Sequence, residues 1–414
     1  MDDTKLKQLI VGTPQGDAGR LVKESRYVFN YQTPEHSREV SLVMPYRAES
    51  YADTVLPSVF AMNRPEGYLL DKLRERFGKL IRLDDMRLLA ITGANQIGRL
   101  RYVDPDAPHE AVRAEVGLSA LLSAGASDEL FEHLVSVYLS SGISGFQPKV
   151  MMPDADALTP LVEKSTAVTP DLIVKAAGDD YEHLAQNEFL CMSAAREAGI
   201  VVPEFWLSDD RSLFVMRRFD LEGPERHPLG FEDMAVLTGR AAEQKYLGSY
   251  EKIATMIGYL CAENKAQSLA RFFEYVTLSV MVRNGDAHLK NFGLIYDHPG
   301  GRAPTLAPLF DVVTTTVYSH YDPQSGRTLT DRTLALKLGK SRDYPNRRVL
   351  MEFGRTACGV ARPERVIERI ASAMFATLEQ HKARIDPSFL TAMRAQWEQG
   401  CAAVRDTKLF AAKS

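Results

Sequence analysis

Residues 284–292 read NGDAHLKNF, a stretch that places Asp286, His288, Lys290 and Asn291 within six positions. It follows the apolar, helix-like run LARFFEYVTLSVMV and precedes the strand-like run GLIY. Phosphoryl transfer needs a carboxylate that orients the attacking hydroxyl, an amide oxygen for magnesium, and positive charge near the transferred group. Asp286, Asn291 and Lys290 can supply one of these each. The stretch is therefore a candidate catalytic loop.

The spacing of the residues within this loop is similar to that of protein-kinase catalytic loops. Asn291 stands five residues after Asp286, which is the interval of the protein-kinase pattern HRDxxxxN. No His-Arg pair precedes Asp286, and His288 instead stands two places after it, which gives the pattern DxHxxN. A surface turn of polar residues is the alternative. The coincidence of so many useful groups at the entry to a strand favours the catalytic loop.

A second carboxylate follows at the distance of a short hairpin. Asp311, in the segment LAPLFDVVTTT, lies twenty residues beyond Asn291 and directly after an apolar run. Magnesium is a hard cation that prefers oxygen ligands, so a carboxylate at this place suits it. Taken alone, Asp311 could also be a helix or turn cap. Its position after the catalytic loop favours a second metal ligand.

A single lysine interrupts an apolar, strand-like run. Lys175 lies in LIVKAA, and a buried lysine needs a partner or an anion. In a kinase such a lysine holds the α- and β-phosphates of ATP and pairs with a carboxylate on the following helix. Glu188, in QNEFL, is the natural candidate for that carboxylate. The alternative is an edge strand with Lys175 in solvent.

A glycine-bearing turn precedes these strands. Residues 141–149 read SGISGFQPK, with Gly142 and Gly145. Glycines let backbone amides close on a phosphate group, which favours a nucleotide-binding loop. A simple connection between a helix and a strand is the alternative. Lys149 and the lysine-bearing strand downstream favour the phosphate-binding interpretation.

The order of the predicted elements indicates the fold class. Short apolar runs between Leu9 and Met44 predict a small antiparallel sheet. Residues 112–139 have helical spacing and are followed by the strand-like runs KVMM and LIVKAA, the helical segment NEFLCMSAAREAGI, and the strand pair FWLSD and LFVMRRFD. From Phe231 onward the spacing is mostly helical. We therefore expect an α+β protein with a two-lobed, kinase-like fold, a β-rich N-terminal part and a mainly helical C-terminal lobe.

Composition limits the class of protein but not its function. A net charge of -4 over 414 residues gives no global attraction to nucleic acids or anionic membranes, although a local basic patch can still occur. No segment approaches the roughly 18 apolar residues of a membrane span. The four cysteines lie far apart, unlike those of zinc or dithiol sites, and are typical of buried thiols in a reducing cytosol: Cys191, Cys261, Cys358 and Cys401. A cytoplasmic protein is expected.

Together these motifs resemble those of the HipA family. The family pattern is matched in order by GISGFQPK, IVKA, NEFLCMSAAREAGI, RRFD, DAHLKN and PLFD over residues 140–315. RPEGYLLDKL resembles the family's N-terminal domain, and LALKLGK resembles a basic segment late in the fold. The resemblance implies three parts: a HipA N-terminal subdomain (1–105), a kinase N-lobe with the glycine-rich loop and the phosphate-binding lysine (106–220), and a helical C-lobe with the catalytic loop and metal site (221–414).

The resemblance implies a bacterial protein kinase that uses ATP and Mg²⁺ to phosphorylate serine or threonine. As the toxin of a type II toxin-antitoxin pair, it would arrest growth when its antitoxin is absent. The substrate would be a translation component such as an aminoacyl-tRNA synthetase. The partner would be a HipB-like helix-turn-helix antitoxin that makes the base contacts, so that DNA is bound only indirectly, and no membrane is involved.

The resemblance also implies roles for individual residues. Asp286 would be the catalytic base, supported by His288 and Lys290, and Asn291 and Asp311 would bind magnesium. The nucleotide-binding set would comprise Ser144, Gly145, Lys149, Lys175, Glu188 and the segment from Met216 to Phe219, whose backbone would hold adenine.

Two places depart from the family pattern. Related loops often carry a serine where this chain has Gly142, so the inhibitory autophosphorylation that the family uses falls on Ser144 or, as the second choice, Ser141. At the hinge RRFDLEG, Arg217 and Leu221 stand where relatives often have a glutamate and an arginine. The catalytic set is complete, which predicts an active kinase.

Two rival functions remain open from the sequence. DxHxxN also occurs in inositol-lipid kinases, and related folds phosphorylate small molecules, so a lipid or small-molecule kinase is the nearest rival. The absence of an obvious basic surface for an anionic membrane argues against a lipid substrate. The other rival is an interaction protein, a corepressor that holds a DNA-binding antitoxin on its operator.

Overall fold

The structure is a computed structural model that describes residues 6–65, 70–71, 73–75, 83–93, 96–106, 118–123, 127, 129–130, 133, 165–168, 171–176, 181–322, 327–330 and 332–405. The chain divides into two compact units. Unit 1 contains residues 1–182, 206–232 and 296–302, and unit 2 contains residues 183–205, 233–295 and 303–414.

Unit 1 begins with an antiparallel sheet in the strand order β4-β3-β2-β1-β5. On one face, alternating apolar side chains such as Leu21 and Phe29 are buried, and Phe29 packs on Phe60 with ring centroids 5.2 Å apart. Gly19 is required in the second strand, because a Cβ there would lie 2.2 Å from the carbonyl oxygen of Asn30. The strands are β1 (Gln8–Thr13), β2 (Gly16–Lys23), β3 (Tyr27–Tyr31), β4 (Tyr51–Asp53) and β5 (Arg101–Val103).

A second sheet of unit 1 has the order β6-β7-β9-β8, with β7 antiparallel to both of its neighbours. One face of β7 and β9 buries apolar side chains against the helical segments, in a cluster that includes Val174, Val215, Leu88 and Leu121. These strands are β6 (Ser165–Val168), β7 (Leu172–Ala176), β8 (Phe205–Leu207) and β9 (Leu213–Arg217). The remaining elements are α1 (Ser58–Ala61), α3 (Asp85–Thr92), α4 (Leu118–Ser123), η1 (His36–Arg38), β10 (Leu221–Glu222) and β11 (His227–Pro228).

A buried ion pair follows the last residue of β9. Arg218 donates from Nη2 to Asp220 Oδ2 at 2.6 Å and from Nε to Asp220 Oδ1 at 3.0 Å, and both side chains are almost fully buried. Asp220 Oδ2 also accepts from the backbone amide of Gly98 at 2.7 Å, and Arg218 Nη2 donates to the carbonyl of Gln96 at 2.6 Å. The RRFD segment is therefore bound to residues 96–98, far away in the sequence.

A second buried carboxylate joins distant segments of unit 1. Glu232 accepts hydrogen bonds from Ser41 Oγ at 2.5 Å, from the amide of Leu42 at 2.8 Å and from the hydroxyl of Tyr296 at 2.5 Å. Since Glu232 is 1% exposed, these donors replace the water that its charge would otherwise require. Residues 41–42, 232 and 296 are thereby fixed to one another.

Unit 2 is mainly helical. Its helices are α6 (Leu184–Glu197), α7 (Met234–Leu237), α8 (Tyr250–Leu260), α9 (Lys265–Met281), α10 (Arg347–Thr356), α11 (Pro363–Gln380) and α12 (Pro387–Val404). Short 3-10 turns are η2 (Ala242–Gln244), η3 (Ala262–Asn264), η4 (Leu289–Asn291) and η5 (Thr315–Val317). Its strands are β14 (Thr305–Leu306), β15 (His320–Asp322), β16 (Arg327–Leu329), β17 (Thr333–Leu338) and β18 (Ser341–Asp343). The residues of β12 (Gly230–Asp233) and β13 (Gly293–Tyr296) are divided between the two units.

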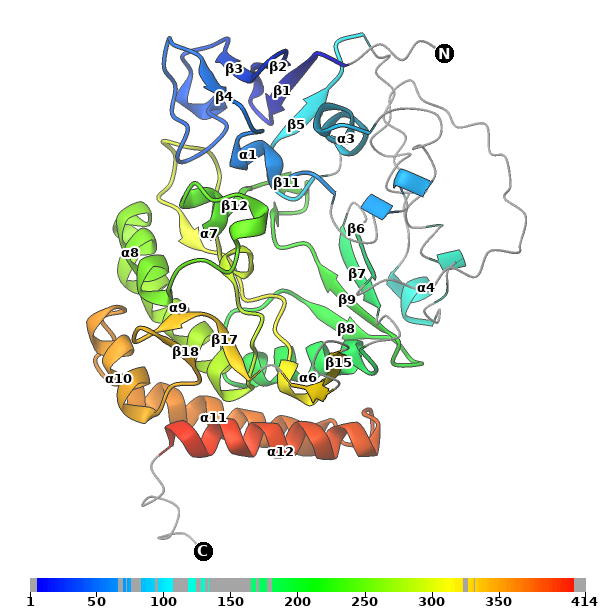
Figure 1. Ribbon diagram of the computed structural model, residues 1–414, viewed down its shortest axis with the longest axis vertical. Coiled ribbons are helices and arrows are strands. Elements are labelled where there is room, and N and C mark those ends of the chain that lie inside the picture. The colour runs from blue at the N-terminus through cyan, green and yellow to red at the C-terminus, as the bar shows by residue number, and fades with distance from the viewer. Residues whose placement is uncertain are drawn as a thin grey trace, which may run out of the picture. The chain divides into compact units, whose positions relative to one another are not determined.

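The C-terminal helices pack closely in unit 2. Figure 1 shows α11 and α12 running side by side, in orange and red, and α12 also contacts α9. Trp397 of α12 is fully buried. A Cβ at Gly400 would lie 2.0 Å from the carbonyl oxygen of Met281, the last residue of α9. Only glycine therefore permits the close approach of these two helices.

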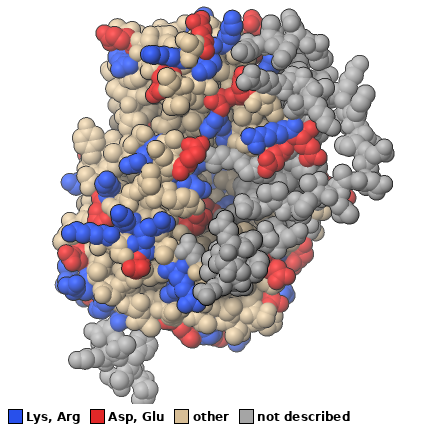
Figure 2. Space-filling view, viewed as in Figure 1, with Lys and Arg blue, Asp and Glu red and all other residues tan. Residues whose placement is uncertain are grey.

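The β17–β18 hairpin carries exposed cations. Its turn places Gly339 and Lys340 in the left-handed region, with φ of 57° and 76°, and the Gly339 amide donates to Glu251 Oε1 at 2.8 Å. Figure 2 shows lysine and arginine side chains gathered where Figure 1 places this hairpin and α10. A local basic group thus exists on a chain of net charge -4. Its exposed members include Lys337, Lys340, Arg342 and Arg348.

The α+β class is confirmed, and so are the elements that the sequence predicts around the chemistry. LIVKA forms β7, the segment containing NEFL lies in α6, and GLIY forms β13. All four cysteines are free and buried. No helix in the described ranges is both long and apolar enough to cross a membrane. The boundaries at residues 105 and 220 stay predictions, and the strand KVMM lies outside the described residues.

Removing the carboxylate of Asp220 should destabilise unit 1 strongly. Asp220→Ala removes the carboxylate that receives two hydrogen bonds from the buried Arg218 guanidinium, and breaking such a buried pair costs about 3–5 kcal/mol. The free energy of unfolding, measured by urea denaturation of the full chain, checks this. Glu222→Ala is the matched control, because its pair with Arg302 is exposed and should contribute at most about 1 kcal/mol. Equal costs for the two variants would contradict the role given to the buried pair.

Candidate catalytic site

The candidate catalytic loop begins where α9 ends. Arg283 adopts a left-handed conformation, with φ of 60°, and the Asn284 amide donates to the Ser279 carbonyl at 2.8 Å, which stops the helix. The Asn284 side chain then accepts from the Asp286 amide at 2.9 Å. The chain therefore reverses directly after a buried helix and presents Asp286 at the start of the loop.

The two predicted metal ligands lie side by side. Asn291 Nδ2 donates to Asp311 Oδ2 at 2.6 Å, although the two residues are twenty positions apart. Asn291 Oδ1 accepts from the His288 amide at 3.2 Å, which fixes the side chain within η4. Asp311 has a φ of 57°, a conformation that costs energy for a residue with a Cβ. Strained backbone of this kind is concentrated at functional sites.

The donor set at this point fits magnesium. Asn291 and Asp311 bring an amide and a carboxylate together, and both groups offer the oxygen ligands that hard cations prefer. Magnesium usually takes only one or two protein carboxylates and fills its remaining positions with water and substrate phosphates. The described residues contain no cluster of three or more His, Cys, Asp or Glu side chains arranged to hold a metal. A magnesium held jointly with a nucleotide fits this small ligand set.

The segment after Asp311 is fixed by a buried amide. Asn187 of α6 accepts from the Thr314 amide at 2.8 Å and donates to the Thr314 carbonyl at 3.0 Å. Trp397 Nε1 donates to Thr314 Oγ1 at 2.9 Å. All of these groups are fully buried, so each bond satisfies a polar group that has no access to water. The path of the chain beyond Asp311 is therefore set by α6 and α12.

The next residue joins this segment to the catalytic loop. Thr315 Oγ1 accepts from the Gly285 amide at 2.8 Å and donates to the Arg283 carbonyl at 3.1 Å. The Thr315 amide donates to the same carbonyl at 3.2 Å. The residues before Asp286 and those after Asp311 are thus held together directly. The pairing of Asn291 with Asp311 follows from this arrangement.

His288 is buried in the loop and is neutral at physiological pH. Burial lowers the pKa of His288 to about 4, although the nearby Asp286 carboxylate opposes the shift. Its Nδ1 is buried and has no hydrogen-bond partner within the described part of the chain. Its Nε2 lies 3.9 Å from Asp286 Oδ1, beyond hydrogen-bond distance. His288 therefore contributes bulk and polarity to the loop rather than a positive charge.

A tyrosine that the sequence did not single out contacts the candidate base. The hydroxyl of Tyr246 donates to Asp286 Oδ1 at 2.8 Å, and its ring meets the His288 ring edge-on at a centroid distance of 5.2 Å. Tyr246 lies between η2 and α8, forty residues before Asp286. Asn187, Thr314 and Tyr246 were all missed, since a buried amide, a threonine and an exposed tyrosine carry no pattern of their own.

In unit 1, two of the predicted nucleotide-binding residues share one face of the second sheet. Lys175 pairs with Phe214 in the register of β7 and β9, and Ile173 pairs with Met216. Residues opposite each other point to the same side, so Lys175 and Met216 lie on the face away from the cluster around Val174. The Lys175 ammonium lies 5.9 Å from the centre of the Phe214 ring. The register thus places Lys175 and Met216 on the same face of the sheet.

The other predicted residues fall in several places. Glu188 is 1% exposed in α6 and belongs to unit 2, whereas Lys175 belongs to unit 1. Phe219 follows β9 and packs edge-on against Phe231, with ring centroids 5.3 Å apart. The pairing of Lys175 with Glu188 stays a prediction. The glycine-rich turn lies outside the described residues, with Ser141, Ser144, Gly145 and Lys149.

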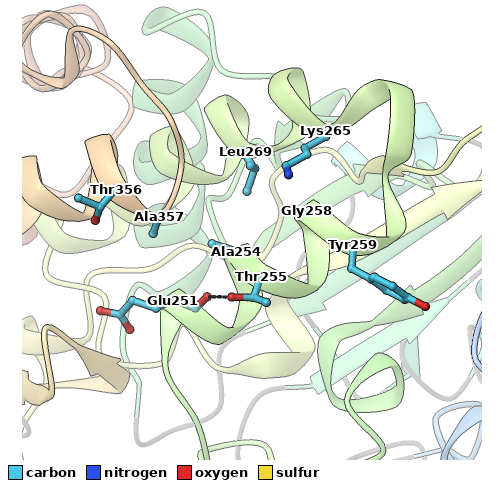
Figure 3. Close-up of a pocket in the computed structure, with 9 residues that line it drawn as sticks. All are labelled: Glu251, Ala254, Thr255, Gly258, Tyr259, Lys265, Leu269, Thr356 and Ala357. Atoms are coloured by element: carbon cyan, nitrogen blue, oxygen red, sulfur yellow. Dashed lines mark hydrogen bonds between the residues drawn. The ribbon is translucent and has the colours of Figure 1, made fainter.

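A separate pocket of about 580 Å³ lies in unit 2, and Figure 3 shows the side chains that line it. It is formed by α8, the start of α9 and the end of α10, and its lining includes Thr255, Tyr259, Lys265 and Thr356. None of its lining residues belongs to the predicted catalytic or nucleotide-binding set. This pocket is distinct from the candidate catalytic site.

Two family models match the sequence. The HipA N-terminal domain matches residues 9–103, and the HipA-like C-terminal domain matches residues 141–381. The second match covers more than half of the chain and contains the catalytic loop, Asp311 and the lysine-bearing strand.

Curated relatives carry kinase names. A Sinorhizobium fredii protein named "Putative kinase Y4dM" is 33% identical over 164 residues, which are 35% of this chain and 38% of that protein. A Haemophilus influenzae protein named "Putative kinase" is 30% identical over 190 residues, which are 42% of this chain and 53% of that protein. The chain thus spans between about a third and about half of the length of these two relatives.

One solved structure shares the fold over nearly the whole chain. The structure of the Shewanella oneidensis MR-1 toxin-antitoxin system HipA, HipB and its operator DNA complex matches with a TM-score of 0.68. The match covers 95% of this chain and 96% of that one, at 16% sequence identity. At this identity the likeness concerns the fold, and it confirms the predicted HipA-like architecture.

The buried histidine predicts a pH dependence of stability. Because the pKa of His288 is about 4 in the native state and near 6.5 when unfolded, the unfolded chain binds the proton first as the pH falls. Stability present above pH 6.5 is thus lost towards pH 4, by about 3 kcal/mol. Urea denaturation of the wild type and of His288→Gln, without nucleotide or magnesium, measures this loss. A difference between the two that does not change from pH 7 to pH 4 would contradict it.

Proposed function

This chain belongs to the HipA-like family, and on that premise we propose that it is an ATP- and magnesium-dependent protein kinase that phosphorylates serine or threonine. The observation that carries the proposal is the contact of Asn291 with Asp311 beside the loop that bears Asp286. Phosphoryl transfer requires a base for the acceptor and oxygen ligands for magnesium. Asp286, Asn291 and Asp311 offer a carboxylate base, an amide and a second carboxylate in that order along the chain. The kinase names of the curated relatives support the same reaction class.

Asp286 acts on the acceptor. The hydroxyl oxygen of a serine or threonine attacks the γ-phosphorus of ATP, the bond between that phosphorus and the β-γ bridging oxygen breaks, and ADP leaves. Asp286 orients the hydroxyl and takes its proton. The loop suits this role because the position of Asp286 is fixed by Asn284 on one side and by the bond from Gly285 to Thr315 on the other.

The remaining groups hold the nucleotide. Asn291 and Asp311 bind magnesium, which when bound neutralises charge on the ATP phosphates. Lys175 binds the α- and β-phosphates and is paired by Glu188, while Lys290 and neutral His288 support the transferred group. The segment from Met216 to Phe219 holds adenine through its backbone. The place of Met216 on the same sheet face as Lys175 supports a nucleotide on that face.

The glycine-rich turn completes the nucleotide site and regulates it. We assign Ser144, Gly145 and Lys149 to the phosphate-binding loop. Phosphorylation of Ser144, or of Ser141 as the second choice, adds about 1.5 to 2 negative charges where the ATP phosphates bind. Like-charge repulsion would then exclude ATP, so the kinase inactivates itself.

The cellular role that we propose is that of a toxin in the cytoplasm. The substrate is a translation component such as an aminoacyl-tRNA synthetase, whose phosphorylation arrests growth. The partner is a HipB-like helix-turn-helix antitoxin. The shared fold with a chain solved together with HipB and operator DNA supports a partner of this kind, which also makes a corepressor function the second candidate.

Phosphoryl transfer should depend on Asp286. Purified wild type incubated with magnesium and labelled ATP is expected to incorporate phosphate at Ser144 or Ser141, located by mass spectrometry. Asp286→Asn keeps the size of the side chain but loses the base and should reduce incorporation by a factor of about 10² or more. No label on the wild type, together with no ATP consumption in a cell lysate, would exclude the kinase function.

The corepressor function is separable from catalysis. We expect the chain to copurify with a small DNA-binding protein encoded next to it, and operator binding by that protein to become tighter when the chain is added. Because Asp286→Asn leaves the surface largely unchanged, repression should persist in that variant. A gel-shift titration measures this, and a chain that neither copurifies with such a protein nor affects its DNA binding would contradict the partnership.

A further inference from the structure

The carboxylate of Asp286 is held from outside its own loop. Its side chain is 37% exposed, so its Cα–Cβ and Cβ–Cγ bonds can rotate unless another group holds the carboxylate. The Tyr246 hydroxyl donates to Oδ1 at 2.8 Å. His288 is the neighbouring polar ring, but its Nε2 lies too far away, at 3.9 Å, to fix the same oxygen. Within the part of the chain that the structure describes, the orientation of the Asp286 carboxylate therefore depends on the hydrogen bond from Tyr246.

Tyr246 is itself held against the catalytic loop. The Leu289 amide donates to the carbonyl of Lys245 at 3.1 Å, which joins the tyrosine-bearing turn to η4 through the backbone. The ring packs edge-on against His288, and the Lys245 ammonium lies 5.2 Å from the ring centre. On the C-terminal side, the Lys337 amide donates to the Gly248 carbonyl at 3.3 Å. The hydroxyl is thus presented to Asp286 by a supported turn.

The phenol is suited to a constant donor role. Burial and the adjacent Asp286 carboxylate both raise the pKa of Tyr246, so the hydroxyl keeps its proton at physiological pH. It donates a hydrogen bond to the carboxylate without changing the charge there. A hydrogen bond to one carboxylate oxygen leaves the other one with its lone pairs.

We propose that Tyr246 is a positioning residue for phosphoryl transfer: its hydroxyl fixes Oδ1 of Asp286 and thereby aims Oδ2 at the hydroxyl of the substrate. This inference rests on the proposed kinase function and deepens it. Misplacement of a reacting group by about 1 Å can cost up to 10²-fold in rate, so an orienting bond of this kind affects kcat. It should leave the binding of ATP unchanged, because Tyr246 acts on the acceptor side.

Tyr246→Phe isolates the hydroxyl, because phenylalanine keeps the ring packing on His288. Steady-state phosphorylation of a serine-containing protein acceptor, or initial autophosphorylation, gives kcat and the KM for ATP. We expect kcat to fall about ten- to a hundredfold, with the KM for ATP and the melting temperature unchanged. Tyr259→Phe is the matched control, since Tyr259 lies in the same unit, is 81% exposed and belongs to the separate pocket of Figure 3. It should leave kcat unchanged.

Other outcomes would overturn the proposal. A kcat that is unchanged or raised in Tyr246→Phe would mean that the hydroxyl does not aim Asp286 and, if raised, that it occupies the place of the substrate. Phosphate found on Tyr246 by mass spectrometry would make it an acceptor instead. An equal loss in Tyr259→Phe would point to a general loss of structure.

The proposal can also be judged if the kinase function fails. Should the wild type transfer no phosphate, crystal structures of the wild type and of Tyr246→Phe would still compare the Asp286 side chain directly. A carboxylate that rotates or becomes disordered only in the variant supports the positioning role. An unchanged Asp286 conformation overturns it, whatever the reaction is.

Discussion

The paired hydrogen bonds between the Asn187 side chain and the backbone of Thr314 are the constraint on which the candidate site depends. They join α6 to the segment that leaves Asp311, and Trp397 adds a third bond from α12. Because these groups are fully buried, the loss of one partner leaves another polar group without water, which costs roughly 1–3 kcal/mol. Helices α6 and α12 therefore both fix the segment that follows Asp311, the proposed second metal ligand. Thr315 then transmits that position to the start of the catalytic loop.

Much of the site could be predicted from the sequence because its chemistry depends on residue type and spacing. The apolar run, the hairpin length and the ligand preference of magnesium predict Asn291 and Asp311 as two ligands of one metal, and the structure places the two side chains in contact, with Asn291 Nδ2 2.6 Å from Asp311 Oδ2. Their role as metal ligands stays a prediction. The alternation of β7 likewise predicts that Lys175 points away from its apolar neighbours. The first feature can be predicted from the spacing of residues along the chain and the second from the alternation of side chains in a strand. The HipA-like fold followed from the order of these motifs, and the match over the whole chain confirms it.

The residues that support the site could not be predicted, because their hydrogen-bond partners are brought to them only by the tertiary structure. Tyr246 is one of 16 tyrosines, and only the turn that carries it decides that its hydroxyl meets Asp286. Asn187 gives no sequence signal either, since a buried asparagine inside a helix has no recognisable pattern until its partner is known. The left-handed conformation of Asp311 was equally hidden, because aspartate tolerates that region more readily than most residues and gives no sequence signal. Contacts between residues far apart in the sequence, rather than the conformational preferences of single residues, decide the places of these three side chains.

The buried carboxylate of Glu232 has a consequence for how this architecture can evolve. Three of its donors are known by position: Ser41 and Leu42 lie within the segment matched by the N-terminal family model, and Tyr296 lies within the segment matched by the C-terminal one. A gene fragment that encoded only the second segment would leave Glu232 without its hydrogen bonds from Ser41 and Leu42. The two sequence modules are therefore coupled through Glu232, and a recombination that keeps these bonds has to bring Ser41 and Leu42 along with the glutamate. The two family models divide the sequence between residues 103 and 141, but the hydrogen bonds of Glu232 connect residues from both sides of that division.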